Sequence, residues 1–168
     1  VGSEMCIRDR TGALRCAWML NEPEEVVGLA SSVLAQNKLN PELETEARYY
    51  RAKALLKDGR GTEAVKDLEV LAKDTRNVYG AEAKYLLAQY YFDEGNTAEA
   101  EKEILDYIDV STPHAYWLAR SFVLLSDVYM KLGRNLDAKQ YLLSLKQNYQ
   151  ADDDIAEMIE VRLSKLNK

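Results

Sequence analysis

A residue pattern that recurs three times is the feature that most constrains the fold of this chain. Each copy has six positions of fixed character: small, large apolar, glycine, small, aliphatic and large apolar. The copies start 36 and then 38 residues apart, and a period of this length indicates an array of one supersecondary unit. The matched sets are Ala52, Leu55, Gly59, Ala64, Leu68, Leu71; Ala88, Tyr91, Gly95, Ala100, Ile104, Tyr107; and Ser126, Tyr129, Gly133, Ala138, Leu142, Leu145.

The glycine of each copy predicts the end of a helix. Gly59, Gly95 and Gly133 each follow an apolar stretch and precede a polar one, as expected where the chain turns through a left-handed residue. A residue able to cap a second helix comes after each glycine: Thr62, Thr97 and Asn135. Each unit is therefore predicted to be two helices joined by a tight turn. The small residues twelve positions apart would let the two backbones approach closely.

Further helices are predicted on both sides of this array. Asn40-Pro41 provides a cap and a first-turn proline for a helix that runs to about Asp58, and Thr112-Pro113 does the same for a helix ending near Leu132. Upstream, residues 16–20 and 24–36 resemble a degenerate pair with a shortened first helix and Ala30 in the small position of the second. Downstream, Asp152-Asp153-Asp154 precedes an amphipathic helix, as expected of a terminal capping helix.

Composition excludes several other classes of protein. The 168 residues carry a net charge of −6 at a pI near 5.0, which argues against a generic nucleic-acid binder. His114 is the single histidine and lies beside a proline at a predicted helix start, so we expect an exposed helix terminus rather than a general base. The three aspartates at 152–154 lack the spacing of a calcium loop. We therefore expect no catalytic residues, no metal site, no cofactor and no membrane insertion by this segment.

The repeat pattern resembles the tetratricopeptide repeat (TPR), from about Cys16 to Tyr149. The resemblance rests on the order of small residue, large apolar residue, turn glycine, alanine and large apolar residue in helix pairs. Two departures stand out: the spacings exceed the usual 34 residues, and Arg48, Lys84 and Phe122 replace the early tryptophan. The resemblance implies an all-α fold, an α-solenoid of antiparallel helix pairs with a C-terminal capping helix.

The pattern also predicts how the chain is divided. Residues 1–10 have no periodicity that joins them to the rest of the chain, so we expect a leader that is either non-native or a short disordered terminus. Residues 11–168 would form one solenoid: a degenerate partial repeat at 11–40, repeats at 41–76, 77–112 and 113–150, and a capping helix at 151–168. We expect the C-terminal fragment of a longer bacterial TPR protein. Its compartment stays open between the cytoplasm and the bacterial envelope or periplasm.

In a TPR solenoid the first helix of each pair lines a concave groove, and this implies a set of groove-facing residues. The implied partner-binding residues are Tyr49, Lys53, Lys57, Tyr85, Gln89, Phe92, Arg120, Asp127 and Lys131. Aromatic anchors beside mixed charges suit the capture of a peptide or protein segment. The alternative, which stays open for Tyr85, Phe92 and Met130, is that these side chains only pack against a neighbouring repeat. The positions of the clamp for chaperone carboxylate tails hold Tyr49, Lys53, Leu86, Arg120 and Leu124, so that clamp is not expected.

These observations predict a non-enzymatic scaffold for protein–protein interaction. Two alternatives remain: a structural end-cap or self-association segment of a longer repeat protein, and a substrate-recruiting module of an enzyme whose catalytic domain lies elsewhere. Residues 61–110 hold 12 acidic and 5 basic residues. This acidic middle repeat is either a solvated outer face, including Glu99, Glu101 and Glu103, or a surface that steers a basic partner.

Overall fold

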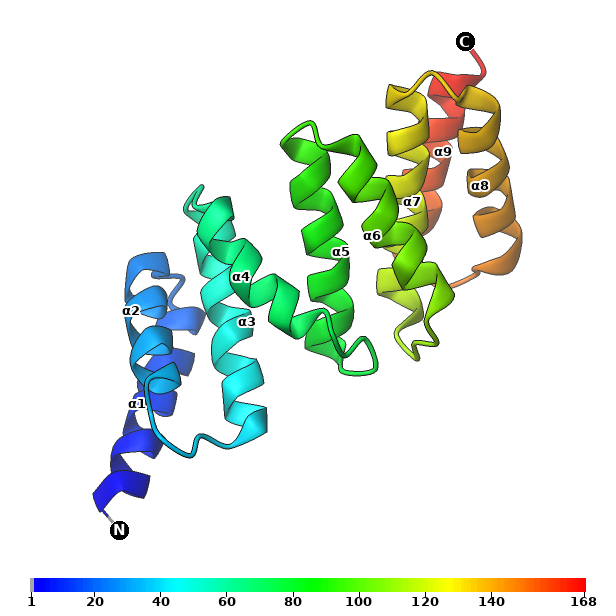
Figure 1. Ribbon diagram of the computed structural model, residues 1–168. Coiled ribbons are helices and arrows are strands. Elements are labelled where there is room, and N and C mark those ends of the chain that lie inside the picture. Colours follow the sequence, from blue (N-terminus) through cyan, green and yellow to red (C-terminus); the bar gives the residue numbers. More distant parts are fainter. Residues whose placement is uncertain (1) are drawn as a thin grey trace. The chain divides into compact units, whose positions relative to one another are not determined.

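The computed structural model describes residues 2–168, with side chains from residue 9 onward, and this part of the chain contains helices and no strand (Figure 1). Most helices follow the predicted pairs. They are α1 (Gly2–Met19), α2 (Pro23–Leu34), α3 (Pro41–Lys57), α4 (Gly61–Leu71), α5 (Val78–Asp93), α6 (Thr97–Asp109), α7 (Ala115–Lys131), α8 (Asn135–Asn148) and α9 (Ile155–Leu166).

The predicted glycine turns are confirmed. Gly59, Gly95 and Gly133 have φ of 73°, 83° and 76°, which L side chains rarely adopt. After each glycine the next backbone N–H bonds to a carbonyl five residues earlier; Arg60 N to Leu55 O, for example, is 2.8 Å. This is the Schellman hydrogen bond, which satisfies a carbonyl that the helix end would otherwise leave unpaired. Three residues therefore suffice to reverse the chain in each pair.

The predicted caps after these glycines are wrong. Thr97 and Asn135 are already the first residues of their helices and Thr62 the second, because the Schellman turn puts the residue after glycine at the cap position. The cap residues are Arg60, Asn96 and Arg134, and none caps through its side chain. The two arginines instead reach forward to carboxylates in the first turn. Arg60 Nε is 2.7 Å from Glu63 Oε1, and Arg134 Nε is 2.8 Å from Asp137 Oδ2.

Other predicted helix starts are confirmed or shifted slightly. Asn40 accepts a 2.8 Å hydrogen bond from Glu42 N, with Pro41 at the first helical position. Asp153 accepts a 3.0 Å bond from Ile155 N at the start of α9. Helix α7 begins at Ala115, two residues after the predicted proline, because Thr112 is used in the loop: its Oγ donates to Thr75 O at 2.8 Å.

The chain forms two compact units, residues 1–74 and 75–168. In the first unit α1 packs on α2, α2 on α3 and α3 on α4. Helix α1 is longer than the predicted stretch 16–20 and continues through residues 2–10, where the sequence predicted a leader. Residue 1 and the side chains of 2–8 lie outside the described part, so the non-native origin of this segment stays a prediction.

Helices α1 and α2 form a pair with the same three-residue turn. Asn21, at φ 60°, takes the place of the glycine, and Glu22 N bonds to Ala17 O at 3.1 Å. Aligned on this turn, Leu14 and Val26 occupy the positions of the small residues Ala52 and Ala64. Ala30 therefore does not hold the small position that the sequence assigned to it. The sizes are therefore reversed relative to the α3–α4 pair: Leu14 and Val26 are large where that pair is small, and Ala17 and Ala30 are small where it is large. Leu14, Ala17, Val26 and Ala30 are all buried.

One buried carboxylate joins three helices of the first unit. Asp67 in α4 is 1% exposed and receives two bonds from Arg51 in α3, Nε to Oδ2 at 2.6 Å and Nη2 to Oδ1 at 2.7 Å. Arg48 Nη1 donates to the same carboxylate at 3.1 Å. The remaining guanidinium nitrogen of Arg51, Nη1, donates to Ser31 Oγ of α2 at 3.2 Å. The bonds to these arginines replace the hydrogen bonds to water that the Asp67 carboxylate loses on burial. They therefore offset the free-energy cost of burying its charge.

In the second unit α5 packs on α6 and α7 on α8, and α7 also contacts α5, α6 and α9. The small residues Ala88, Ala100, Ser126 and Ala138 are at most 1% exposed, which confirms close packing within each pair. Helix α9 buries Ile155, Ile159 and Leu163 in a cluster with residues of α7 and α8. These contacts are those predicted for a capping helix.

Gly59→Ala and Gly28→Ala should change stability in opposite directions. Open space surrounds both glycines, so only the backbone decides. Alanine at Gly59 must adopt a left-handed conformation, which costs about 1–2 kcal/mol. At Gly28, inside α2, alanine should stabilise the helix by roughly 0.5–1 kcal/mol. Urea unfolding followed by circular dichroism measures both; equal effects would contradict the proposed backbone origin.

Asp67→Asn should destabilise the first unit strongly. The substitution leaves Arg48 and Arg51 without the carboxylate that both of them bind. Breaking such a partly buried ion pair costs about 3 kcal/mol. Glu63→Gln, on the same helix, is the matched control, because its pair with Arg60 lies at the surface and should contribute little. Equal shifts of the urea midpoint for the two variants would show that the buried network does not stabilise the unit.

Candidate partner-binding surface

Tyr85 of α5 contacts Arg120 and Trp117 of α7, the first helix of the next pair. Its side chain is 6% exposed and belongs to the core cluster of the second unit, so its ring offers little surface to a ligand. Its hydroxyl, however, accepts a 2.9 Å hydrogen bond from Arg120 Nη2 of α7. The structure thus brings together Tyr85 and Arg120, which are 35 residues apart in sequence.

Hydrogen bonds extend from this pair in both directions. Along α5, the Tyr85 hydroxyl donates to Gln89 Oε1 at 3.0 Å, and Gln89 Nε2 donates to Asp93 Oδ1 at 2.8 Å. On the other side, Arg120 Nη1 donates to the Tyr116 hydroxyl at 3.0 Å, which donates to Asp154 Oδ1 at 3.0 Å. We refer to this set as the Arg120 network: Tyr85, Gln89, Asp93, Tyr116, Arg120 and Asp154.

Two aromatic rings lie close to the Arg120 guanidinium. Its Cζ is 4.9 Å from the ring centre of Tyr85 and 5.9 Å from that of Tyr116. Trp117 contacts both tyrosine rings, at 5.6 and 5.0 Å between centres. Burial alone would lower the pKa of Arg120, but the hydrogen bonds to the two phenols and their electrostatic interaction raise it above its ordinary value. The guanidinium is therefore charged and fixed in orientation.

The remaining predicted residues of the second unit have separate contacts. Lys131 Nζ, at the end of α7, lies 5.1 Å from the ring centre of Phe92 in α5. Asp127 forms a two-bond ion pair with Arg162 of α9, with Nε–Oδ1 at 2.7 Å and Nη2–Oδ2 at 2.8 Å. Asp127 is thus committed to holding the terminal helix, a role that the sequence did not indicate.

In the first unit, the predicted residues Tyr49, Lys53 and Lys57 lie on α3 beside an aromatic cluster. The ring of Trp18 in α1 is 4.8 Å from that of Tyr50 and 6.2 Å from that of Tyr49. Lys53 Nζ lies 5.9 Å from the Tyr49 ring centre, and Lys57 Nζ donates to Asn21 Oδ1. The three rings are partly exposed, so this cluster could offer apolar contact surface to a ligand.

Sequence reasoning missed four residues that shape these surfaces: Trp18, Tyr116, Asp154 and Arg162. Tyr116 could have been found, because it lies one helical turn before Arg120 on the same face. Asp154 and Arg162 come from the segment assigned only to capping, and Trp18 comes from the pair treated as degenerate. Arg162 contacts a residue 35 positions away, Tyr116 and Asp154 are 38 positions apart, and Trp18 of α1 contacts Tyr49 of α3. A local sequence pattern does not indicate contacts over such separations.

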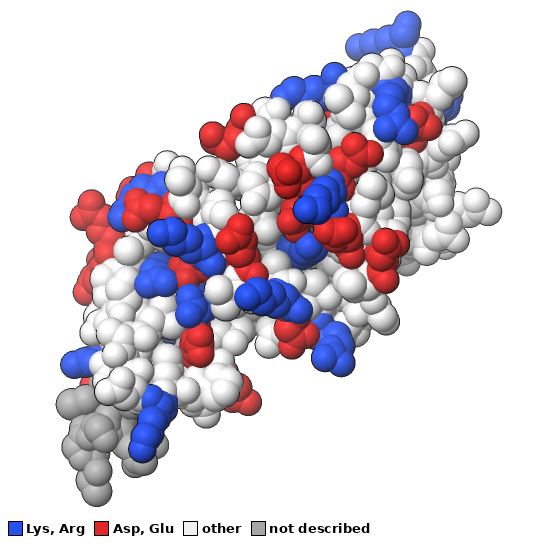
Figure 2. Space-filling view, in the orientation of Figure 1, with Lys and Arg blue, Asp and Glu red and all other residues white. Residues whose placement is uncertain are grey.

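Acidic side chains of the middle repeat lie beside basic ones. Figure 2 shows the same mixture of acidic and basic side chains over the face in view. Glu103 of α6 pairs with Lys84 Nζ at 2.5 Å, and Glu101 lies 3.8 Å from Arg134 Nη1. These contacts offset part of the charge of α6. They support a solvated outer face more than a surface that steers a basic partner.

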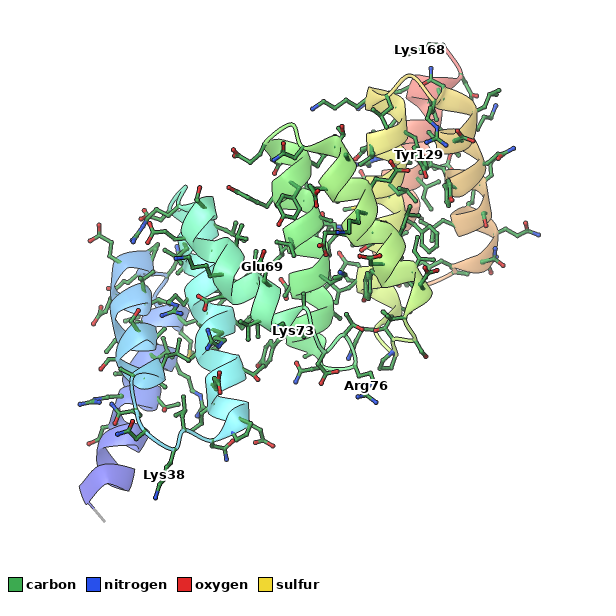
Figure 3. The ribbon with its side chains drawn as sticks, in the orientation of Figure 1. Lys38, Glu69, Lys73, Arg76, Tyr129 and Lys168 are labelled. Atoms are coloured by element: carbon green, nitrogen blue, oxygen red, sulfur yellow. The ribbon has the colours of Figure 1, made fainter. Side chains whose placement is uncertain are left out.

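The surroundings of His114 give no support for catalysis. It occupies the cap position of α7, and its Nε2 is 2.7 Å from the carbonyl oxygen of Arg76, the loop residue labelled in Figure 3. Among the described side chains, no cluster of three or more His, Cys, Asp or Glu residues could hold a metal ion. Over residues 2–168, every helix is too short or too polar to cross a membrane.

Comparison with known proteins identifies the fold. No protein-family model and no curated protein matches the chain. Two solved structures do match: a protein of Podosopora anserina assigned as a kinesin light chain, with nearly identical TPR-like repeats, and a variant of that protein with one substitution. The TM-scores are 0.65 and 0.66 at 17% and 18% identity. Each match covers 95% of this chain and 84% of the other.

The chain therefore has the all-α fold of TPR-like repeats, as the glycine-punctuated pattern predicted. Proteins built from such repeats generally act as scaffolds for protein interaction and are typically not catalytic, because stacked helix pairs present extended binding surfaces. The predicted bacterial origin, the compartment and the division into repeats stay predictions.

Tyr129, labelled in Figure 3, links α7 to the neighbouring second helices. Its side chain is 4% exposed, its ring lies 5.5 Å from Tyr141 of α8, and Arg134 Cζ is 4.3 Å from its centre. Burial first, and then the nearby charge of Glu101, raise the pKa of Tyr129 to about 12. Folding thus favours the neutral phenol.

The stability of the second unit should accordingly fall at high pH. A phenol ionises near pH 10 in the unfolded chain and near pH 12 in the folded one, so this stabilisation is complete below pH 10 and declines as the pH rises toward 12. Urea midpoints measured between about pH 9 and 11.5 should decrease, and Tyr129→Phe should make that decrease shallower. An unchanged slope in the variant would contradict the assignment.

Proposed function

We propose that this chain is a non-enzymatic scaffold that binds a peptide or protein segment along its first helices. The observation that carries the proposal is the Arg120 network, in which hydrogen bonds hold polar groups of α5, α7 and the residue before α9 in fixed positions. Groups fixed before binding lose little conformational entropy when a ligand arrives. The fold supports the proposal, because TPR-like repeats are generally interaction scaffolds.

The residues divide between direct contact and support. In the second unit, Gln89, Phe92, Arg120 and Lys131 keep exposed surface and contact the ligand, whereas the buried Tyr85 acts through its hydroxyl. Asp127 holds α9 in place through Arg162. In the first unit, Tyr49 and Lys53 present aromatic and charged surface beside Trp18, and Lys57 adds an exposed ammonium group.

The same features argue for a protein partner rather than a nucleic acid or a substrate. The net charge is −6, so phosphate backbones would be repelled overall. Tyr116 and Arg120, both partly exposed in the second unit, are of residue types often found as anchors in protein interfaces. Among the described residues, the single histidine serves to join two loops.

A random peptide library displayed on phage and selected on the 168-residue chain tests this function. Synthetic versions of the selected peptides, labelled with fluorescein, are titrated in fluorescence anisotropy. The double variant Gln89→Ala with Lys131→Ala removes two exposed first-helix contacts and should weaken binding at least about tenfold.

The matched control is Glu99→Ala with Lys102→Ala, two exposed residues of opposite charge on second helix α6. It should bind like the parent, and circular dichroism should show all three proteins equally helical. Equal loss in both variants, or loss only in the control, would place binding elsewhere, and a library that yields no specific peptide would count against a peptide-binding scaffold.

A further inference from the structure

A cavity of about 390 Å³ opens between helices α2, α3 and α4 of the first unit (Figure 1). Its volume falls in the range of pockets that hold small organic molecules. The apolar part of its wall comes from Val27 of α2 and Leu55 of α3, and the polar part includes the Arg51–Asp67 ion pair and the first turn of α4. None of the residues assigned above to partner binding lines this cavity, so it is a separate site.

Comparison with the second unit indicates why this cavity is open. Leu55 and Asp67 line the cavity, and the aligned positions of the second unit, counted from the turn glycine of each pair, hold tyrosines. The rings of these tyrosines, Tyr129 and Tyr141, lie 5.5 Å apart, and Arg134 Cζ is 4.3 Å from the centre of the Tyr129 ring. The first unit has an aliphatic side chain and a carboxylate in place of the two rings. These smaller side chains leave room for a ligand.

The carboxylates that line the cavity already accept hydrogen bonds on both oxygens. Asp67 receives Arg51 Nη2 on Oδ1 at 2.7 Å and Arg51 Nε on Oδ2 at 2.6 Å. Glu63 receives Arg60 Nε on Oε1 and Arg60 Nη2 on Oε2, both at 2.7 Å. Each of the two acids is thus held by its own arginine, and neither needs a ligand to satisfy it.

The remaining hydrogen-bonding capacity of the wall consists of donors. Lys66 lines the cavity and, among the described residues, forms no ion pair. Arg51 and Arg60 each keep N–H groups beyond those that bind the two carboxylates, because a guanidinium has five. Thr62, the second residue of α4, also lines the cavity, so the positive end of the helix dipole lies beside these cations. Three cationic and two anionic side chains give the wall a net positive charge, which suits an anionic ligand rich in acceptors.

A phosphate monoester matches this wall better than a carboxylate does. It carries a charge of about −1.5 to −2 at pH 7 and three acceptor oxygens, whereas a carboxylate has a single charge and two oxygens. Lys and Arg are the side chains that bind phosphate most strongly. Val27 and Leu55 add apolar surface that inorganic phosphate would leave uncovered. The wall therefore favours a phosphate attached to an organic group.

We propose that the cavity between α2, α3 and α4 binds the phosphate monoester of a small organic molecule. Lys66, Arg60 and Arg51 contact the phosphate near the first turn of α4, and the organic group lies against Val27 and Leu55. This site goes beyond the peptide-binding function, because its residues differ from those assigned to the peptide and it takes a different class of ligand.

Titration of the isotope-labelled full chain with phenyl phosphate, followed by amide chemical shifts in two-dimensional NMR, tests the proposal. Phenyl phosphate carries the monoester on a small apolar ring. The amides of Ser31 and Thr62, which line the cavity, should shift and saturate. Benzyl alcohol has the ring without the phosphate and should cause no saturable shift there. A parent without saturable shifts at these amides, or one that responds equally to benzyl alcohol, would overturn the proposal.

Two further probes separate the parts of the ligand. Inorganic phosphate lacks the organic group and should bind roughly tenfold more weakly than phenyl phosphate, because it buries no apolar surface. Benzoate keeps the ring but has a single charge and one acceptor fewer, so it should bind at least about threefold more weakly. Equal affinity for inorganic phosphate would overturn the organic ligand, and equal affinity for benzoate would overturn the choice of phosphate.

Lys66→Gln removes the cation that has no ion pair. It should weaken phenyl phosphate at least about tenfold, the loss expected for a charge-assisted hydrogen bond. The matched control is Lys102→Gln, because Lys102 is exposed at the same position of α6. The control should bind like the parent. Equal affinities of the two variants would overturn the proposal.

Leu55→Tyr puts into the cavity the ring that the second unit has at the aligned position. This variant should lose saturable binding of phenyl phosphate while circular dichroism shows unchanged helicity. A folded Leu55→Tyr protein that binds like the parent would contradict the proposed location of the site. Lys66→Gln changes an exposed side chain, so it decides the question even if the larger residue at Leu55 prevents folding.

Discussion

The close contact between the two helices of each pair is the constraint on which the rest of this structure depends. Ala52 and Ala64 are fully buried where α3 meets α4, and Ala88 with Ala100 holds the same position between α5 and α6. Interiors pack at crystal-like density, so one added methylene at such a crossing would push the helices apart. The α1–α2 pair keeps the contact with the sizes exchanged, Leu14 and Val26 against Ala17 and Ala30. The packing therefore constrains the total side-chain volume where the two helices cross more than it constrains which positions hold the small residues.

Packed helices can then position polar groups with a precision that single helices lack. Arg120 reaches Tyr85 because α5 and α7 pack side by side within the second unit. The same principle operates in the first unit, where Arg51 spans from Asp67 to Ser31, but there the charge is compensated and the effect is stability. Arg51 thus joins helices through a buried carboxylate, whereas Arg120 joins α5 to α7 through the neutral hydroxyl of Tyr85.

Much of the fold could be predicted from the sequence, because backbone requirements leave local signatures. A glycine with positive φ ends α3, α5 and α7, and Asn40-Pro41 starts α3, as their positions predicted. The sequence failed where another residue meets the same requirement, as Asn21 does at the end of α1. It also failed where side chains pair over long separations. Tyr85 and Arg120 were both predicted, but as independent anchors, since no local pattern shows that the hydroxyl of one holds the guanidinium of the other. The position of Asp154 beside Arg120 depends on how α9 packs, which lies beyond local sequence.

The distribution of connection lengths bears on how such a chain changes over evolutionary time. Every connection inside a pair has three residues, with one left-handed residue in the middle, whereas successive pairs are joined by five or six residues. An insertion inside a pair would destroy the Schellman hydrogen bonds, but one between pairs only lengthens an exposed loop, which costs little entropy. The spacing changes at the helix ends that face the junctions: α6 and α7 have 13 and 17 residues where α4 and α5 have 11 and 16, whereas the connection before α7 has five residues and the one before α5 has six. An ancestral array of equal repeats could acquire spacings of 36 and 38 residues through such changes at the helix ends and still preserve every three-residue turn.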